Sequence, residues 1–312
     1  MNRYNLCCLP TPLHRLDRVN LGIEAWIKRD DLTGFAMGGN KGRKLEFLVA
    51  DWLSRGVRAV VTCGASDSNF IRQLAVVGRM VGIEVHAAVM DLPFDSAAGR
   101  PKGHSTYRGN EVLSIQAGAK LYKEADGDWE DMYESMEQIS RDLNNEGVFA
   151  EVVPVGGSSP QGVHAFVQAS KELNETFDTI VVASSSGSTH VGLATAFHGT
   201  ATRVIGISAD PEPTLVEDFA VLSQAYGERT GGLALTKFDL DLRFVGPGYG
   251  VPSEGGRRAQ QKLLESEGIY LDPVYTAKAF DGFMNLAAEG VLGSKALFWH
   301  TGGMPSIFTE FA

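Results

Sequence analysis

Short apolar runs rich in β-branched residues recur along the chain, and each ends in a turn rich in Gly or Ser before a helical pattern begins. The clearest of these runs occupy residues 59–62, 85–89, 179–183 and 203–207. Runs of this kind are typical of buried strands in a parallel sheet whose crossover connections are helices. Helices are expected at 43–54, 161–173 and 254–267. The sequence therefore predicts an α/β fold with mainly parallel sheets flanked by helices.

Composition and charge exclude several classes of protein. The 312 residues suffice for two domains of ordinary size, and the net charge of −10 argues against a basic stripe for nucleic acid. No apolar run approaches the roughly 20 residues that span a bilayer, and the N-terminal residues make a poor secretory signal. Cys7, Cys8 and Cys63 offer neither a disulfide framework nor a zinc-binding pair. We therefore expect a cytoplasmic enzyme without a metal site, a nucleic-acid partner or a membrane contact.

Two stretches of the sequence are irregular. Residues 91–110 are rich in Pro, Gly and Ser, as is typical of a long loop, which could either cover a site or be a surface excursion without a role. A second break falls near 126–129. No shift in composition marks a linker between consecutive domains, so one domain inserted within another is compatible with the sequence.

A turn of small residues follows the run at 179–183. Ser186, Gly187, Ser188 and Thr189 lie between this run and a helical pattern. Such a turn at a helix N-terminus presents backbone N–H groups and hydroxyls to an anion, for example a phosphate. An ordinary helix cap rich in Ser and Thr would look the same, so both interpretations stay open at this point.

Lys41 stands in the turn 37–41, where it follows two glycines and Asn40 and opens a helical pattern. A lysine that is buried at the start of a helix loses hydration and lies at the positive end of the helix dipole. Both effects favour the neutral amine that imine formation requires. The alternative is an exposed lysine on a solvated helix face, and the pattern alone does not decide between the two.

A set of motifs in a fixed order resembles a known family. They include GGNKGRKLEFL around Lys41, GASDSNFIRQLA, PVGGSSPQG, SSSGSTHVGLA, GPGYGVPSEG, LDPVYTAKA and HTGGMPSIF. In this order and spacing they resemble the pyridoxal-phosphate (PLP) enzymes of the tryptophan-synthase-β fold. More narrowly, the chain is similar to the family of 1-aminocyclopropane-1-carboxylate (ACC) deaminase and D-cysteine desulfhydrase. The resemblance covers nearly the whole chain.

The resemblance implies an architecture and a cofactor. Two α/β domains would hold PLP in the cleft between them. The larger would comprise residues 1–44 and 151–312, and the smaller, residues 45–150, would be inserted in it. The family also suggests a homodimer. Lys41 would form the Schiff base with PLP, and Lys44 would have a lesser role.

The resemblance also assigns roles to polar residues of the cleft. The turn from Ser186 to Thr189 would hold the phosphate. Asn69 would bond the phenolic oxygen of PLP, and Ser68 would lie beside the carboxylate or the reacting carbon of the substrate. Tyr275 would lie against the pyridine ring, and Tyr249 would face the substrate. Without the resemblance, ordinary core aromatics would be the preferred interpretation of both tyrosines.

Thr276 and Thr301 favour the desulfhydrase branch over the deaminase branch. At these positions the resemblance implies glutamate and leucine for ACC deaminases. Thr276 would face the pyridine nitrogen, where a hydroxyl in place of a carboxylate makes a weaker electron sink. Such a sink suits β-elimination, because the leaving group itself carries away the electron pair. Gly157 and Thr301 would contact the substrate.

Three positions depart from the family pattern. Phe70 stands where Gln or His is usual beside the substrate carboxylate, and Asp67 stands where Gln is common. The segment 162–166 ends in Phe166 and so lacks a tyrosine hydroxyl. Three changes around one pocket would indicate an unusual substrate, unless other side chains supply the lost contacts.

The expected function is a PLP-dependent lyase that eliminates a leaving group from a small amino acid, with D-cysteine as the first candidate. The products would be pyruvate, ammonia and hydrogen sulfide. Other PLP reactions on the same scaffold are alternatives: sulfo-lyase action on L-cysteate, β-replacement, racemisation or ACC deamination. A PLP-binding protein with little catalysis is the alternative from a different class.

Overall fold

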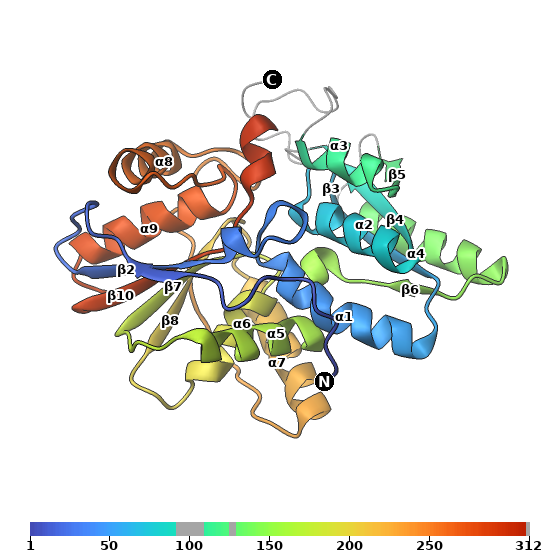
Figure 1. Ribbon diagram of the computed structural model, residues 1–312, viewed down its shortest axis with the longest axis horizontal. Helices are drawn as coiled ribbons and strands as arrows, with labels where there is room; N and C mark the ends of the chain where they lie inside the picture. Colours follow the sequence, from blue (N-terminus) through green and yellow to red (C-terminus); the bar gives the residue numbers. More distant parts are fainter. Residues whose placement is uncertain (92–108, 125–128, 310–312) are drawn as a thin grey trace.

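The computed structural model describes residues 1–91, 109–124 and 129–309, which form two sheets with helices around them (Figure 1). The larger sheet runs in the order β1 (Leu13–Arg15), β2 (Glu24–Arg29), β10 (Lys295–His300), β7 (Thr179–Ser184), β8 (Arg203–Ser208) and β9 (Asp239–Asp241). The smaller sheet runs in the order β5 (Lys120–Lys123), β4 (Glu84–Met90), β3 (Ala59–Ala65) and β6 (Ala150–Val152). Every strand pair is parallel except β1 with β2. The predicted α/β fold with mainly parallel sheets is confirmed.

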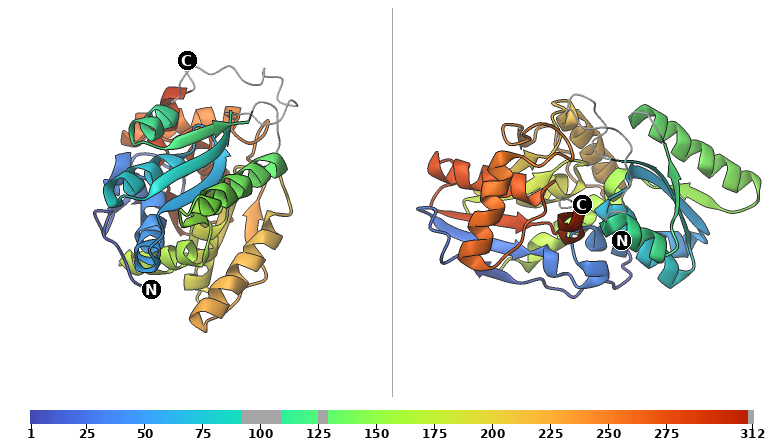
Figure 2. Two further views of the ribbon diagram at one scale, coloured as in Figure 1. Left: turned by 90° about the vertical axis from the view of Figure 1, so that its right-hand side faces the viewer. Right: turned by 90° about the horizontal axis from the view of Figure 1, so that it is seen from above.

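Helices cover both faces of each sheet, as parallel sheets require (Figures 1 and 2). Around the larger sheet lie α5 (Pro160–Ala169), α6 (Ser188–Phe197), α7 (Leu215–Thr230), α8 (Glu254–Glu267) and α9 (Thr276–Ala288). Around the smaller sheet lie α2 (Asn69–Val81), α3 (Gly109–Gln116) and α4 (Trp129–Asn145). Helix α1 (Lys41–Arg55) packs against α5 of the larger sheet and α2 of the smaller one, so it lies where the two halves of the structure meet.

The predicted elements agree with the structure apart from their ends. All four predicted runs are strands, and 254–267 is helical over its whole length. The predicted helix 161–173 is instead α5, which ends at Ala169 and tightens into the 3-10 turn η5 (Ser170–Glu172). The predicted loop 91–110 lies largely outside the described residues, as does most of the break at 126–129.

The chain enters the smaller sheet at β3 and leaves it after β6, so residues 59–152 contain all of its strands. This arrangement is that of an insertion, and the boundaries 1–44, 45–150 and 151–312 stay predictions.

The two sheets, each with the helices around it, form two layers, and separate apolar clusters fill them. Phe280, Phe283 and Phe298 pack under the larger sheet, whereas Trp52 and Phe70 belong to the core around the smaller one.

A buried cluster of charged groups ties the start of α1 to the larger sheet. Arg43 donates to Asp30 (Nη2 to Oδ1, 2.7 Å) and to Glu172 (Nη1 to Oε1, 2.5 Å). Lys28 donates to the same Glu172 at 2.6 Å, and Trp299 Nε1 donates to Asp30 at 2.9 Å. Because Arg43 is two residues from Lys41, this cluster anchors the first turn of α1.

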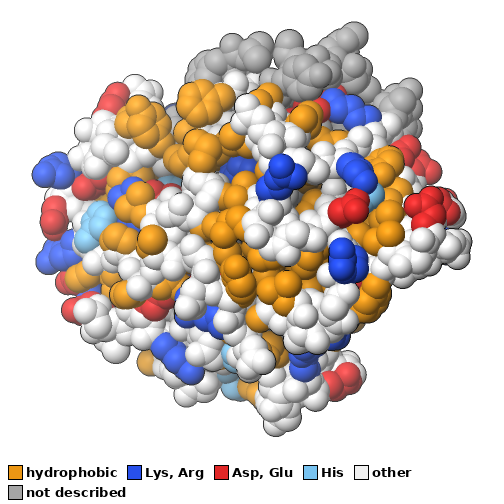
Figure 3. Space-filling view, turned by 45° about the vertical axis from the view of Figure 1, so that its right-hand side comes forward, with side chains coloured by type: hydrophobic (Ala, Val, Ile, Leu, Met, Phe, Trp, Pro, Cys, Tyr) orange, Lys and Arg blue, Asp and Glu red, His pale blue; other side chains and the backbone are white. Residues whose placement is uncertain are grey.

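The surface shows no single dominant feature on the face drawn in Figure 3, where Lys and Arg side chains are scattered among apolar and acidic ones. No helix among the described residues has the length and apolarity to cross a bilayer. Within the same part of the chain, no group of three His, Cys, Asp or Glu side chains is arranged to bind a metal ion.

Candidate active site

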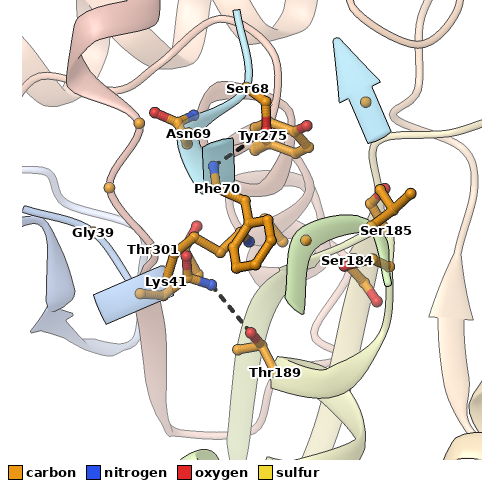
Figure 4. A pocket seen from close by; sticks show the side chains of 18 of the residues that line it. Gly39, Lys41, Ser68, Asn69, Phe70, Ser184, Ser185, Thr189, Tyr275 and Thr301 are labelled. Atoms are coloured by element: carbon orange, nitrogen blue, oxygen red, sulfur yellow. Dashed lines mark hydrogen bonds between the residues drawn. The ribbon is translucent and has the colours of Figure 1, made fainter. Parts of the chain in front are cut away.

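A cavity lies where the carboxyl ends of β3, β7 and β10 meet the starts of α1, α2 and α6 (Figure 4). Ligand sites of open α/β sheets lie at this edge, because the loops that follow the strands converge there. Most of the predicted site residues line the cavity: Lys41, Ser68, Asn69, Phe70, Ser186, Gly187, Thr189, Tyr249, Tyr275 and Thr301. Gly157, Ser188 and Thr276 are not among its lining residues.

Lys41 is the first residue of α1 and borders the cavity. The residue before it is held in place twice, since Asn40 Nδ2 donates to Thr189 Oγ1 at 3.1 Å and Asn40 N donates to the Thr301 carbonyl at 2.9 Å. Figure 4 draws the contact with Thr189 as a dashed line. Loss of hydration lowers the pKa of Lys41 to about 8, although the charge of Asp272 opposes this shift. A larger fraction of Lys41 is therefore neutral at neutral pH than of an exposed lysine.

Lys44 lies one helical turn beyond Lys41 and also reaches the cavity. It is buried, and its Nζ donates to the carbonyl of Gly156 at 3.0 Å. Burial, and then the neighbouring charge of Lys41, lower the pKa of Lys44 well below its ordinary value. Neither lysine forms an ion pair with a carboxylate among the described residues. Two amines at one cavity, that of Lys44 fully buried, can both donate hydrogen bonds to an anion bound there.

The Ser–Gly turn lies at the same cavity. Helix α6 begins at Ser188, and its N-cap residue Gly187 has no side chain that could accept from the first N–H groups. The Ser188 N–H donates to Ser158 Oγ at 3.1 Å. The hydroxyl of Ser188 is buried without a hydrogen-bond partner in the described part of the chain. The positive end of a helix and two nearby amines at one cavity suit a phosphate. The phosphate-binding role of this turn stays a prediction.

Gly187 is required by the shape of the turn. Its φ is +95°, and a Cβ on it would lie 2.4 Å from Cδ1 of Phe219. We expect Gly187→Ala to lower the free energy of unfolding by about 1–3 kcal/mol and to weaken phosphate binding. Urea denaturation, with and without phosphate, measures both effects.

Gly199→Ala is the matched control for Gly187→Ala. Gly199 has a φ of +74° and lies just beyond the other end of α6, but nothing lies within 4 Å of its Cβ position. We expect Gly199→Ala to lower the free energy of unfolding by about 1 kcal/mol, through backbone strain alone, and to leave phosphate binding unchanged. Equal losses in the two variants would contradict the collision with Phe219.

Ser68 caps helix α2, because its Oγ accepts from the N–H groups of Phe70 and Ile71 at 3.2 and 3.3 Å. The hydroxyl proton of Ser68 therefore stays available for an acceptor in the cavity. Asn69 is the first residue of the same helix. Next to it, the ring of Phe70 packs so tightly on Gly157 that a Cβ there would lie 2.7 Å from Cε2 of the ring. Gly157 thus lies behind Phe70, and its role toward a substrate stays a prediction.

Tyr249 and Tyr275 form another part of the cavity wall, where their hydroxyl oxygens are 2.5 Å apart. Burial raises the pKa of Tyr249 to about 12 and that of Tyr275 well above its ordinary value. Both phenols are therefore protonated at neutral pH. Trp129, at the start of α4, packs on Tyr249 with ring centroids 6.3 Å apart and brings the smaller layer against this wall.

Thr276 is fully buried in the first turn of α9, directly after Tyr275. Its hydroxyl donates to Oδ1 of Asp272 at 2.6 Å and accepts from the N–H of Asp272 at 2.8 Å. Asp272 also accepts from the N–H groups of Val274, Tyr275 and Thr276. The proposed contact of Thr276 with the pyridine nitrogen stays a prediction.

Two of the three departures from the family pattern lie away from the cavity, so the expectation of three changes around one pocket is wrong. The Asp67 carboxylate accepts from the N–H of Asn110 at 2.8 Å and from Thr309 Oγ1 at 2.7 Å, which links α3 to the C-terminal 3-10 helix η6 (Met304–Thr309). Phe166 is buried under the larger sheet against Trp299. Only Phe70 faces the cavity.

Sequence reasoning missed several lining residues: Asn40, Gln73, Trp129 and His190. Asn40 and His190 each adjoin a predicted site residue, so their position in the motif was an available signal. His190 is buried, and loss of hydration lowers its pKa to about 4, so it is neutral. Nothing in the sequence indicates Trp129, because only the packing of the two layers brings it to the cavity.

Comparison with known proteins gives concordant matches over the full length. The model of the family described as "Pyridoxal-phosphate dependent enzyme" matches residues 5–302. A D-cysteine desulfhydrase of Yersinia enterocolitica is 35% identical and covers 98% of this chain and 95% of its own. One of Salmonella paratyphi B is 36% identical with the same coverage.

A second name occurs among the relatives. A putative ACC deaminase of Pyrococcus abyssi is 35% identical over 98% of this chain and 93% of its own. The crystal structure of an ACC deaminase homologue superposes with a TM-score of 0.90 at 32% identity, covering 99% of this chain and 94% of the other. The chain is therefore similar to proteins named for two different reactions.

Proposed function

Because this chain belongs to the family of pyridoxal-phosphate-dependent enzymes, we propose that it catalyses α,β-elimination from a small amino acid, with D-cysteine as the first candidate. D-Cysteine and water would yield pyruvate, ammonia and hydrogen sulfide. The observation that carries the proposal is that the first position of α9, directly after Tyr275, holds Thr276 and not a carboxylate. The Thr276 hydroxyl itself donates to Asp272. A weaker electron sink suffices when the sulfur leaves with the electron pair, and opening a cyclopropane offers no such leaving group.

PLP, when bound, supplies an electron sink for the bonds broken at the substrate Cα. The chain's own residues supply binding and proton transfer. The turn at Ser186–Thr189, with Lys44 opposite, suits the cofactor phosphate, and Lys41 would hold the cofactor covalently. The free amine of Lys41 would take the Cα proton of the substrate, because its pKa of about 8 keeps part of it neutral.

Ser68 and Tyr249 suit the two ends of the substrate. The free hydroxyl proton of Ser68 and the N-terminus of α2 can receive the carboxylate, which compensates for the apolar Phe70. Tyr249 stays protonated, so it can donate a hydrogen bond to the departing sulfur but cannot act as a base at neutral pH. The contact with Tyr275 supports Tyr249 in this position.

A substrate panel with the holoenzyme tests this proposal. We expect D-cysteine to yield equal amounts of pyruvate and sulfide, whereas L-cysteine, L-cysteate and ACC are turned over at least about 100-fold more slowly, which corresponds to about 3 kcal/mol of discrimination between transition states. Pyruvate is assayed by its reduction in a coupled reaction, and sulfide is assayed separately.

Other outcomes of the panel identify the alternatives. Formation of 2-oxobutyrate from ACC at the highest rate would contradict elimination at sulfur and assign the protein to deamination. Sulfite from L-cysteate would indicate a sulfo-lyase. Spectral changes with D-cysteine but no product would indicate a binding protein. Assembly as a homodimer and residence in the cytoplasm also stay predictions, and sedimentation of the purified holoenzyme tests the first.

A further inference from the structure

Arg72 is a buried cation that the proposed reaction does not use. It lies on α2, one turn beyond Asn69, and only 1% of it is exposed. Its guanidinium forms no ion pair among the described residues, although the charge of Asp67 acts on it from a distance. Burying an arginine without an ion pair is unfavourable unless its N–H groups meet well-placed acceptors. The identity of those acceptors therefore indicates what Arg72 does.

The acceptors of Arg72 lie around the cavity wall. Nη1 donates to Oδ1 of Asn69 at 2.8 Å and to Oδ1 of Asn110, and Nη2 donates to the Gly38 carbonyl at 3.0 Å. Asn69 lines the cavity that contains Lys41, and Gly38 precedes Lys41 by three residues. One guanidinium thus contacts two segments of the active site and the first turn of α3.

The contact with Arg72 determines which way the Asn69 amide points. A guanidinium can only donate, so the atom of Asn69 that faces it must be the oxygen. Asn110 reinforces this orientation, because its Nδ2 also lies within 3.3 Å of Asn69 Oδ1. With the oxygen held on this side, the NH2 group of Asn69 points the other way. It has no hydrogen-bond partner among the described residues, and Figure 4 shows Asn69 beside Ser68 at the cavity.

Asn110 cannot rotate to release Asn69, because its own groups are engaged. Its N–H donates to Asp67 Oδ1 at 2.8 Å. Its Nδ2 donates to the Asp67 carbonyl and to Ser306 Oγ, each at 3.0 Å. Rotation of the Asn110 amide would bring an NH2 group against Arg72, which has no acceptor to offer. The orientation of Asn69 therefore follows from a chain of contacts with one consistent assignment.

We propose that Arg72 is a positioning residue that holds the Asn69 amide so that its NH2 group faces the cavity as a donor to the phenolic oxygen of PLP. The inference rests on the proposed role of Asn69. A donor beside this oxygen stabilises its negative charge, which makes the Lys41 nitrogen bound to the cofactor easier to deprotonate. Arg72 would thereby tune the site through Asn69 without touching the cofactor.

The test is a double-mutant cycle read from the visible absorption band of the holoenzyme. We expect Arg72→Met and Asn69→Ala each to raise the pH midpoint of the spectral change by about 1 unit. In the Asn69→Ala background, Arg72→Met should add almost nothing, because its effect passes through Asn69. An equal shift in both backgrounds, or no shift in either, would overturn the proposal.

Further variants separate this role from a structural one. Arg79→Met is the matched control, since Arg79 is an exposed arginine in the last turn of the same helix α2 and does not line the cavity. It should leave the midpoint unchanged, and a shift as large as that of Arg72→Met would contradict the proposal. If Arg72→Met does not fold, Arg72→Lys and Asn110→Ala replace it. Lys retains one donor and should stay near the wild-type midpoint, whereas Asn110→Ala should shift it partway.

Failure of this inference can be distinguished from failure of the proposed function. If Asn69→Ala leaves the midpoint unchanged, Asn69 does not bond the phenolic oxygen, and the role of Arg72 fails with it. Elimination from D-cysteine is measured separately by pyruvate and sulfide, so that result leaves the proposed reaction intact. If D-cysteine yields no sulfide but the double-mutant cycle gives the expected shifts of the pH midpoint, the proposed reaction fails and the role of Arg72 stands.

Discussion

Lys41→Ala is expected to lower turnover by about 10³-fold or more and to remove the visible absorption band of the holoenzyme. Two functions are lost together, because Lys41 would both hold PLP covalently and take the Cα proton. The variant should still fold, since Lys41 is the first residue of α1 and makes no ion pair within the described residues. Absorbance after incubation with PLP and pyruvate formation from D-cysteine measure the two losses.

Lys44→Met is the matched comparison for Lys41→Ala. Lys44 is on the same helix and reaches the same cavity, and its Nζ bonds the Gly156 carbonyl at 3.0 Å. This variant should keep the visible band and bind PLP more weakly, because one hydrogen-bond donor near the phosphate is lost. A yellow, active Lys41→Ala variant alongside a colourless Lys44→Met variant would assign the covalent role to Lys44. Reduction with borohydride followed by peptide mapping identifies the modified lysine directly.

Arg43→Met should lower the free energy of unfolding by about 3–5 kcal/mol, the cost of breaking a buried ion pair from one side. The Arg43 side chain is 3% exposed and that of Asp30 is fully buried. Without Arg43, the donors that the described residues offer to the Asp30 carboxylate are Thr11 Oγ1 and Trp299 Nε1. The start of α1 would then loosen, so PLP affinity should fall as well. Urea denaturation of the variant and the parent gives the difference.

Arg55→Met controls for the loss of an arginine from α1. Arg55 pairs with Asp51 at 2.8 Å and with Glu151, but its side chain is 41% exposed. Exposed pairs contribute little, so we expect a loss of about 0–1 kcal/mol and unchanged PLP binding. If both arginine variants lose the same stability, the buried cluster around Arg43 does not carry the stability assigned to it.

Local sequence signals predicted the strands well because they depend on short-range chemistry. The run at 59–62 lies within β3, all of whose residues are buried, and such strands are almost continuously apolar. The turn at Gly187 was also predicted, because a run of small residues between a strand and a helix is a local signal of a tight turn. The end of α5 at Ala169 was not predicted, because residues 170–172 stay helical in a tighter form.

Side-chain roles were less predictable than strands. The motif around Asp67 indicated a substrate pocket, yet its carboxylate bonds Asn110 and Thr309, which are far away in the chain. Phe166 likewise belongs to the core beside Trp299. Both residues lie in motifs of the site, and for that reason they were expected to line the cavity, but their side chains point elsewhere. The direction of a side chain depends on the element that carries it and on the partners packed against it.

The sequence alone determined that Lys41 and the Ser–Gly turn belong to one PLP-type fold, because strand pattern, turn chemistry and ordered motifs are local properties of the chain. Only the tertiary structure decided which distant residues act on them. It brought Trp129 against Tyr249, and it placed Arg72 and Asn110 behind Asn69. These contacts join segments that the packing of two layers brings together, and the direction of each hydrogen bond depends on which donor faces which acceptor.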